Sequence, residues 1–326
     1  MEQGLNLLET EIAIKYIKDT FEKELSKSLG LTRVSAPLFV FPETGLNDNL
    51  NGYERAVRFD VLSLNRDVEI VQSLAKWKRN ALYRYGFKPE TGLYTDMNAI
   101  RRDEVPDAIH SVYVDQWDWE KIILREERKI SYLKKTVRKI YKTLLKVNSL
   151  VEKKYPTIKH NLPKDITFIT AKQLEKDYPT LNRKERENVV TKKYGAVFII
   201  GIGWDLSDKK PHDGRAADYD DWKLNGDILL WFEPLNQALE ISSMGIRVDE
   251  VSLVKQLKKR KETEKLSNPY CQDILNKKLP LTIGGGIGQS RICMYFLNKK
   301  HIGEVQSSVW PEDMIKEYKK QGIDLL

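Results

Sequence analysis

The amino-acid sequence predicts an α/β protein, of the α+β kind, in which an antiparallel-rich sheet is flanked by helices. Two observations lead to this fold class. Stretches of alternating apolar residues follow one another like hairpins, and long amphipathic stretches with helical periodicity lie around them. A third observation concerns domain organisation: the 326 residues contain no repeat and no Pro/Gly/Ser linker, which favours one domain over residues 1–326. A Rossmann fold is disfavoured, because strand–helix–strand units do not alternate.

The first element is an amphipathic helix predicted over residues 6–29. Apolar side chains recur there at helical spacing, and Asn6 and Glu9 have the spacing of a capping box. Gly30 is suited to end the helix, because glycine adopts the left-handed conformation of a C-cap. A short extended stretch follows and ends at Pro37, which cannot donate to a sheet ladder.

The middle of the chain reads as two hairpin-like strand pairs separated by a helix. Period-two alternation indicates the strands, and Gly86 ends the helix between them. In chain order we expect strands over residues 56–64 and 68–71, a helix over 73–85, strands over 92–100 and 111–118 around the charged loop 101–104, and a charge-laced helical region over 119–154.

The second half of the chain continues with strands and helices and ends in a glycine-rich turn. The apolar run 196–200 is typical of a buried strand. We expect, in order, a strand over 166–170, mostly helix over 171–193, the strand 196–200, strands over 227–232 and 238–248, helix over 249–278, and the glycine run 284–288 leading into an apolar helix over 289–297.

Composition narrows the class of protein. Two cysteines, Cys271 and Cys293, exclude a disulfide framework and a Cys-rich zinc module. The apolar runs are too short for a membrane span, and the N-terminus lacks a signal-peptide pattern, so we expect a cytoplasmic protein without a membrane partner. The formal charge of +8 fits a nucleic-acid or polyphosphate ligand, or a Lys-rich solvated surface; the spread of the lysines favours the surface.

Three local features could carry chemistry. The run Thr282–Arg291 places consecutive glycines before a helix that carries an arginine, which suits an anion but also a structural turn. It lacks the ending of a Walker A loop. The loop Ile100–Glu104 places Arg101 at a strand end, where it could clamp a phosphate or belong to an exposed charged loop. The acids of Asp218–Trp222, with Asp227 and Glu240–Ser243 beyond, could hold Mg²⁺, bind an ammonium group or lie in a solvated loop.

Other kinds of site have little support. None of the four histidines pairs with another His or with Cys at metal-ligand spacing, which disfavours a transition-metal site. No Gly-x-Ser-x-Gly segment supports a serine nucleophile.

Three segments together resemble the motifs of class II aminoacyl-tRNA synthetase catalytic domains. They are residues 6–37 ending at Pro37, residues 92–118 with Arg101, and residues 282–297 with Arg291. Longer runs resemble, more specifically and over essentially the whole chain, the ammonia-dependent asparagine synthetases, or aspartate–ammonia ligases. These runs are Asp48–Gly52, Ser73–Arg79, His110–Glu120, Asp218–Trp222, Glu240–Arg247 and Gly284–Arg291.

The resemblance implies a reaction in which aspartate, ATP and ammonia give asparagine, AMP and pyrophosphate through a β-aspartyl adenylate. It assigns Arg101 to the α-phosphate and the substrate carboxylate, and Arg291 to the outer phosphates or AMP. It implies Mg²⁺ at Glu240 and Asp227, although Asp227 lies further from Glu240 than is usual in synthetases. The implied ATP-binding residues are Arg101, Asp227, Glu240, Ser242, Arg247 and Arg291.

The resemblance also implies an aspartate pocket with acids for the substrate ammonium and a cation for its carboxylate. Asp48 is the candidate that binds the incoming ammonium and accepts its proton. One departure concerns the loop over ATP, because family members carry a longer insertion between Trp222 and Leu224. The implied pocket residues are Asp48, Lys78, Gln116, Asp118, Asp220 and Ser243, and the implied catalytic residues are Asp48, Arg101, Gln116 and Arg291.

The resemblance further implies a homodimer built on the first motif, with small-molecule substrates and no nucleic-acid partner. One rival interpretation is an aminoacyl-tRNA synthetase or an aminoacylating paralogue. It would need a tRNA-reading domain, for which the segments outside the three motifs leave little room. A second rival is a non-enzymatic basic module that binds nucleic acid; an intact Arg101, Glu240 and Arg291 argue against it.

Overall fold

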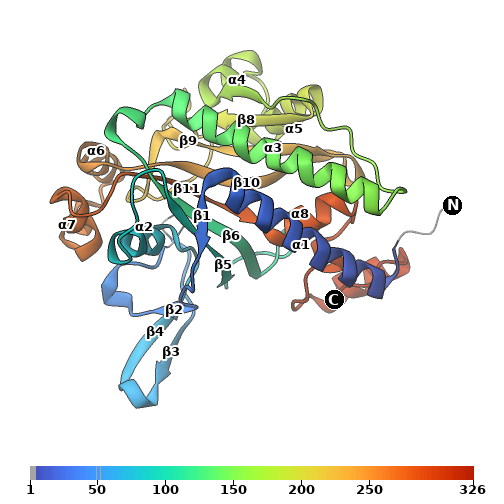
Figure 1. Cartoon of the computed structure of the whole chain (residues 1–326), viewed down its shortest axis with the longest axis horizontal. Coiled ribbons are helices and arrows are strands. Elements are labelled where there is room, and N and C mark those ends of the chain that lie inside the picture. Colours follow the sequence, from blue (N-terminus) through green and yellow to red (C-terminus); the bar gives the residue numbers. More distant parts are fainter. Residues whose placement is uncertain (1–4, 49, 52) are drawn as a thin grey trace.

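A sheet of eight strands forms the middle of the computed structural model, which describes residues 5–48, 50–51 and 53–326 (Figure 1). Neighbouring strands are antiparallel except in the outer pairs β1–β5 and β7–β8. The predicted antiparallel-rich sheet flanked by helices is therefore confirmed. In spatial order the strands are β1 (Leu31–Arg33), β5 (Gly92–Ile100), β6 (Tyr113–Ile122), β11 (Thr282–Gly288), β10 (Gln237–Arg247), β9 (Asp220–Phe232), β8 (Ala196–Ile200) and β7 (Thr167–Thr170).

Helices cover this sheet, and a small second sheet projects from the body below α2 (Figure 1). The small sheet contains β2 (Phe39–Val40), β4 (Arg66–Ile70) and β3 (Arg58–Val61), in that order. The helices are α1 (Leu7–Leu29), α2 (Ala75–Arg84), α3 (Ile130–Lys154), α4 (Ala171–Asp177), α5 (Arg183–Tyr194), α6 (Glu250–Arg260), α7 (Pro269–Leu275), α8 (Gln289–Phe296) and α9 (Glu312–Lys320).

Strand β6 gives the large sheet one apolar and one polar face. Side chains alternate across a strand, so Trp117 and Trp119 point to one side while Gln116, Asp118 and Glu120 point to the other. Both tryptophans are fully buried in the main apolar core. The polar residues form part of a cavity wall or of the charged cluster beside it. The sheet thus separates the core from the polar site.

The apolar face is covered by α1 and α3, which lie side by side (Figure 1). Phe21 of α1 stacks on Trp117 with ring centroids 4.7 Å apart. Burying each of these rings contributes about 1.5–3 kcal/mol. The predicted capping box at Asn6 is present, and Gly30 ends the helix at φ 72°. The first predicted element is therefore confirmed almost to the residue.

The region 119–154 was predicted to be helical throughout, and its first part is wrong. Residues 119–122 continue β6, because they pair with residues 282–285 of β11. The helix begins only at Ile130. Strand β9 begins at Asp220, seven residues before the predicted start of 227, and the helical region 249–278 is divided into α6 and α7. Helix α9 was not predicted.

Strand β10 contains one irregularity that shapes the polar face. Its pairing with β9 shifts between Glu240 and Ser242, which leaves Ile241 as an extra residue, a β-bulge. Ile241 points into the core. Across the bulge, Glu240 and Ser243 both line the cavity, although residues three apart in a regular strand point to opposite faces.

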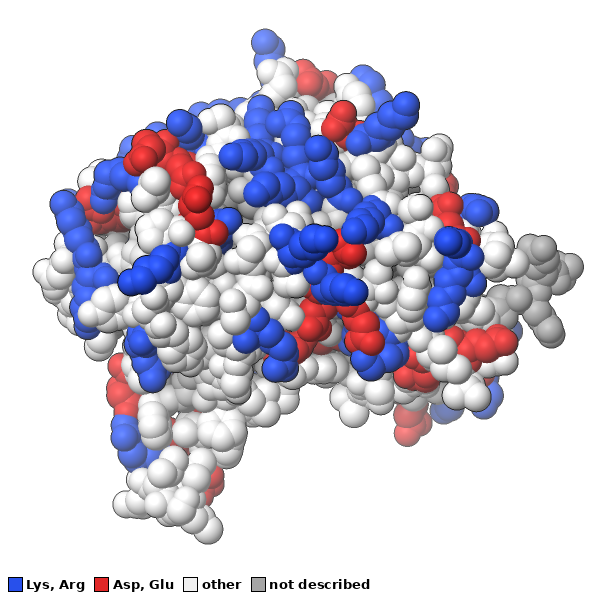
Figure 2. All heavy atoms as spheres, in the orientation of Figure 1, with Lys and Arg blue, Asp and Glu red and all other residues white. Residues whose placement is uncertain are grey.

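The surface of the molecule is rich in lysine. Figure 2 shows Lys and Arg side chains gathered over α3, with acidic side chains among them, and Lys135, Arg138 and Lys142 are exposed there. None of the described helices has the length and apolar character needed to cross a membrane. The segment 1–4, which bears on the signal-peptide expectation, and Asn49 and Gly52 of the run Asp48–Gly52 lie outside the described residues.

Candidate active site

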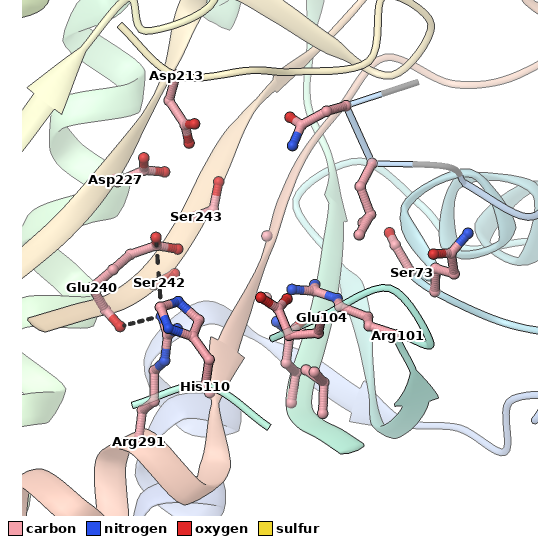
Figure 3. A pocket seen from close by; sticks show the side chains of 18 of the residues that line it. Ser73, Arg101, Glu104, His110, Asp213, Asp227, Glu240, Ser242, Ser243 and Arg291 are labelled. Carbon is pink, nitrogen blue, oxygen red and sulfur yellow. Dashed lines mark hydrogen bonds and ion pairs between the residues drawn. The ribbon is translucent and has the colours of Figure 1, made fainter. Parts of the chain in front are cut away.

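A cavity of about 800 Å³ opens on the polar face of the large sheet (Figure 3). Its walls come from β6, β9, β10 and β11, from α2, α5 and the first turn of α8, and from the loops that contain Asp48, Arg101 and Arg215. The structure brings together all of the residues that the sequence nominated for substrate, ATP and metal. They are Asp48, Lys78, Arg101, Gln116, Asp118, Asp220, Asp227, Glu240, Ser242, Ser243, Arg247 and Arg291.

Lys78 of α2 is the buried cation at one end of the cavity. Its Nζ contacts the carboxylate of Asp118 and donates to the carbonyl oxygen of Gly285 at 3.2 Å. Burial lowers the pKa of Lys78, against the charge of Asp118. A cation and a carboxylate side by side at the cavity wall can meet both charged groups of an amino acid.

Glycines of β11 leave room for the polar side chains of β6. A Cβ added at Gly284 would lie 1.9 Å from Oε2 of Glu120, and one at Gly286 would lie 2.2 Å from Oε1 of Gln116. Any larger residue at either position would displace these side chains. The glycine run therefore shapes the end of the cavity that contains Lys78.

Arg247 lies at the same end of the cavity but is committed to protein partners. Its Nε and Nη2 donate to the carboxylate of Glu120 at 3.0 and 2.7 Å, and its Nη1 contacts Asp220. All three side chains are nearly fully buried. Burial raises the pKa of Asp220 in spite of this arginine. The predicted contact of Arg247 with ATP stays a prediction; its observed contacts hold Asp220 at the cavity wall.

Two arginines face the other end of the cavity. Arg101 directly follows the last residue of β5, so the predicted place at a strand end is confirmed. Its Nε has no hydrogen-bond partner, and its guanidinium has no ion pair within the described residues. Burial lowers the pKa of Arg101, and the charge of Arg291 adds to this effect. Arg291 of α8 donates through Nη1 to the carbonyl oxygen of Glu240 at 3.0 Å (Figure 3).

Arg215 is a further arginine in the cavity wall, and the sequence interpretation missed it. Its Nη2 donates to both carboxylate oxygens of Asp227, at 2.8 and 2.9 Å, and lies 3.1 Å from the hydroxyl of Ser243. Its Nη1 contacts Asp213. Arg215 lies in an irregular loop without periodicity, and the alternating charges of Asp213 and Arg215 were the one available signal.

Asp227 and Glu240 stand close together on one wall (Figure 3). Burial raises the pKa of Asp227 to about 8, against the charge of Arg215, and the neighbouring Glu240 adds to the rise. The hydroxyl of Ser242 is buried next to them without a hydrogen-bond partner in the described chain. No group of three or more His, Cys, Asp or Glu in the described residues could hold a metal by itself.

Asp48 lies in the loop before the small sheet and is 1% exposed. Its Oδ1 accepts the N–H of Leu50 at 2.9 Å, while its Oδ2 has no hydrogen-bond partner within the described residues. Burial raises the pKa of Asp48 to about 6, and the charge of Lys76 opposes that rise. Such a carboxyl group changes its charge close to neutral pH and suits proton transfer.

The resemblance implied that the loop over ATP would differ between Trp222 and Leu224. Residues 222–224 form no loop here, because they lie inside β9. The neighbouring cavity wall comes instead from Asp213, Gly214 and Arg215. His110 also lines the cavity and was not nominated; its Nδ1 lies 2.9 Å from Asp107.

The fold class follows from solved structures. The chain matches asparaginyl-tRNA synthetase from Pyrococcus horikoshii complexed with asparaginyl-adenylate at a TM-score of 0.66 and 15% identity, covering 93% of this chain and 70% of that one. The asparaginyl-tRNA synthetase of Entamoeba histolytica, also with asparaginyl-adenylate, matches at 0.65 and 15%, with 92% and 66% coverage. The protein thus has the fold of a class II aminoacyl-tRNA synthetase catalytic region.

Sequence relatives define the family within that class. A family model described as aspartate-ammonia ligase matches residues 8–322. The aspartate–ammonia ligase of Fusobacterium nucleatum is 60% identical over 99% of this chain and 98% of its own length, and that of Clostridium perfringens strain SM101 is 59% identical over 99% and 96%. The chain belongs to the aspartate–ammonia ligase family and is an enzyme of that kind.

Proposed function

We propose that the enzyme joins ammonia to L-aspartate through a β-aspartyl adenylate and releases AMP and pyrophosphate. The observation that carries this proposal is the state of Arg101, a cation without an ion pair among the described residues that faces the cavity. A guanidinium in that state is complementary to an anion, and its planar fork matches phosphate or carboxylate oxygens.

The first half-reaction needs aspartate held with its side chain towards ATP. Asp118 and Asp220 offer carboxylates for the substrate's α-ammonium, and Lys78 offers a cation for its α-carboxylate. The side-chain carboxylate then attacks the α-phosphorus of ATP. Arg101 and Arg291 line the wall where negative charge on the phosphates increases, so they lower the barrier for release of pyrophosphate.

The second half-reaction forms the amide. Ammonium beside Asp48 gives one proton to the carboxylate, and the nitrogen lone pair attacks the acyl carbon. The carbon–oxygen bond to the phosphate breaks, AMP leaves with the bonding electrons, and the nitrogen loses a second proton to solvent. Asp48 is suited to the first transfer because its Oδ2 has no hydrogen-bond partner within the described residues.

Magnesium is part of the proposal, and Glu240 and Asp227 would hold it. Mg²⁺ prefers oxygen ligands and commonly binds one or two carboxylates together with substrate phosphates. The site meets that requirement with the two carboxylates and the hydroxyl of Ser242, which has no hydrogen-bond partner in the described chain. The substrate phosphates would supply further ligands, so the protein need not provide all of them. When bound, the ion would neutralise charge on the phosphates.

A homodimer through α1 is the remaining part of the proposal. Leu7, Leu8 and Ile12 of α1 are 51%, 71% and 55% exposed, which leaves an apolar strip uncovered on the described chain. The first motif of class II synthetases, which this helix resembles, mediates their dimerisation.

The deciding experiment is exchange of labelled pyrophosphate into ATP by the purified enzyme. We expect exchange that depends on aspartate and Mg²⁺ and needs no ammonia, and AMP as the spent nucleotide once ammonia is added. ADP as the main product would refute the adenylate route. Exchange that responds to asparagine, together with charging of tRNA, would instead support the aminoacyl-tRNA synthetase alternative.

A further inference from the structure

A buried ion pair acts on Asp48 through its charges and does not itself line the cavity. Lys76 Nζ donates to Oδ2 of Asp218 at 2.8 Å, and the two side chains are 8% and 3% exposed. The cavity wall includes Asp48, but neither member of the pair. Burial of a charged pair needs a reason, because replacing such a pair by apolar residues is often neutral or stabilising.

Helix α2 sends its two buried lysines to different carboxylates. Lys76 and Lys78 are two positions apart, and residues at that spacing point in different directions from an α-helix. Lys78 therefore reaches Asp118 at the amino-acid end of the cavity, while Lys76 reaches Asp218. The placement of Lys76 is specific and is not explained by the substrate pocket.

Two carboxylate oxygens beside this pair lack hydrogen bonds. Oδ2 of Asp48 and Oδ1 of Asp218 are buried and have no partner in the described parts of the chain. The charged and titratable groups that face Asp48 are Lys76 from α2, Asp218 and Tyr219 from the loop before β9, and Arg101 from the end of β5. After burial itself, Lys76 has the largest effect on Asp48, and the charge of Asp218 opposes it.

We propose that Lys76 and Asp218 are positioning residues that set the charge of Asp48, so that Asp48 is ionised when ammonium arrives. This inference rests on the proposed function, in which Asp48 accepts the first proton from ammonium. Lys76 favours the ionised carboxylate through its charge, while Asp218 fixes Lys76 by its hydrogen bond and limits that effect by its own charge. Neither residue touches the reacting atoms.

The proposal predicts opposite effects for the two members of the pair. In Lys76→Met, Asp48 and Asp218 lose their shared cation and together retain a proton at higher pH. In the pH profile of kcat/KM for ammonia, the acidic limb should then shift to higher pH by roughly one unit. In Asp218→Asn, the repulsion between the carboxylates of Asp218 and Asp48 is lost, and Lys76 faces Asp48 alone. The acidic limb should therefore shift to lower pH.

The experiment measures that limb together with two reactions that do not need the first proton transfer. Aspartate-dependent pyrophosphate exchange reports formation of the adenylate. Hydroxylamine, which is largely uncharged at neutral pH, replaces ammonia and gives a hydroxamate. We expect both variants to keep exchange and hydroxamate formation within a few-fold of the parent at neutral pH, while Lys76→Met loses roughly tenfold with ammonia. Lys76→Arg, which keeps the charge, should restore the limb towards the parent position.

Lys265→Met is the matched control, because the charge of Lys265 acts on Asp218 but is not among the main influences on Asp48. Its limb should stay at the parent position. The proposal would be overturned if the acidic limb of the pH profile did not move in either Lys76→Met or Asp218→Asn. It would also be overturned if both variants lost exchange, hydroxamate formation and asparagine formation to the same extent. If the parent enzyme shows no aspartate-dependent exchange, the proposed function itself fails, which is a different result.

Discussion

The guanidinium of Arg247 and the carboxylate of Glu120 form a two-pronged buried ion pair between β10 and β6. Three donor–acceptor distances of 2.7 to 3.1 Å join them, and Glu120 is 0% exposed. Burial alone would raise the pKa of Glu120, but the arginine lowers it below its usual value. The pair therefore fixes one arginine, which in turn holds Asp220 against the cavity.

Glu120→Gln should leave the buried charge of Arg247 partly uncompensated. Breaking a buried pair on one side typically costs about 3–5 kcal/mol, so we expect a fall of that size in the free energy of unfolding, measured with urea. The KM for aspartate should rise, because Asp220 loses its fixed neighbour. Lys259→Met removes a partly exposed pair with Asp205 and should change stability by about 0–1 kcal/mol. Equal stability of the two variants would contradict this view.

Arg101→Lys should separate catalysis from stability. Lysine keeps the charge but loses the planar fork, and loss of one donor aimed at a developing charge costs roughly 10²–10³ in kcat. We expect aspartate-dependent pyrophosphate exchange to fall by that factor, with a Tm near the parent value. Arg102→Lys, at the adjacent exposed position, is the control and should retain exchange. The reverse result would transfer the phosphate role to Arg102.

Asp48→Asn should retain pyrophosphate exchange and lose ammonia-dependent turnover by about 10²–10⁴-fold, the usual contribution of a general base. In the parent enzyme, Asp48 with a pKa of about 6 is ionised above that pH and protonated below it. Ammonia-dependent kcat/KM should therefore fall as the pH is lowered through about 6. The pH profile of Asp48→Asn should lack this contribution and keep only the pH dependence caused by protonation of ammonia. A mutant with the parent's full limb would exclude Asp48 as the proton acceptor.

Glutamine should not replace ammonia as the nitrogen donor. Release of ammonia from glutamine needs a nucleophilic cysteine, and both cysteines here are buried. Burial raises the pKa of Cys271 and of Cys293 to about 12, which opposes formation of a thiolate. Product formation with each donor, measured under matched conditions, tests this. Turnover with glutamine equal to that with ammonia would show a glutaminase activity that these thiols do not explain.

Leu8→Asp should weaken the proposed dimer. The side chain is 71% exposed on α1, so the charge should be tolerated in the monomer and should oppose burial in an interface. Sedimentation velocity should show a shift from dimer towards monomer. Val251→Asp, at a 69% exposed position on α6, is the matched control and should leave the sedimentation coefficient unchanged. A parent enzyme that sediments as a monomer would refute the dimer outright.

Periodicity and capping predicted most of the fold, because both depend on neighbours in the chain. The helix over 6–29 and the strand over 196–200 were predicted closely. The error at Trp119 arose where charged residues obscured a strand that is apolar on alternate positions only. The nominated site residues came from the resemblance to a family and not from periodicity, and they do share one cavity.

The ion pair and the arginine that were missed depend on contacts between distant segments. Lys76 and Asp218 are 142 positions apart, and nothing local in either segment reports their ion pair. Arg215 lies in a loop where no regular spacing exists to indicate its direction. Such pairs become visible only when the fold places them together.

The bulge at Ile241 makes the interval between Glu240 and Ser243 a fixed length. If all four residues from Glu240 to Ser243 were paired regularly, without a bulge, the acid and the serine would lie on opposite faces, and one of them would enter the apolar core. Deleting Ile241 would remove the bulge and leave the acid and the serine two positions apart in a regular strand, still on one face, whereas replacing Ile241 by valine would preserve the bulge. In this strand the number of residues between the acid and the serine must therefore match the presence or absence of the bulge.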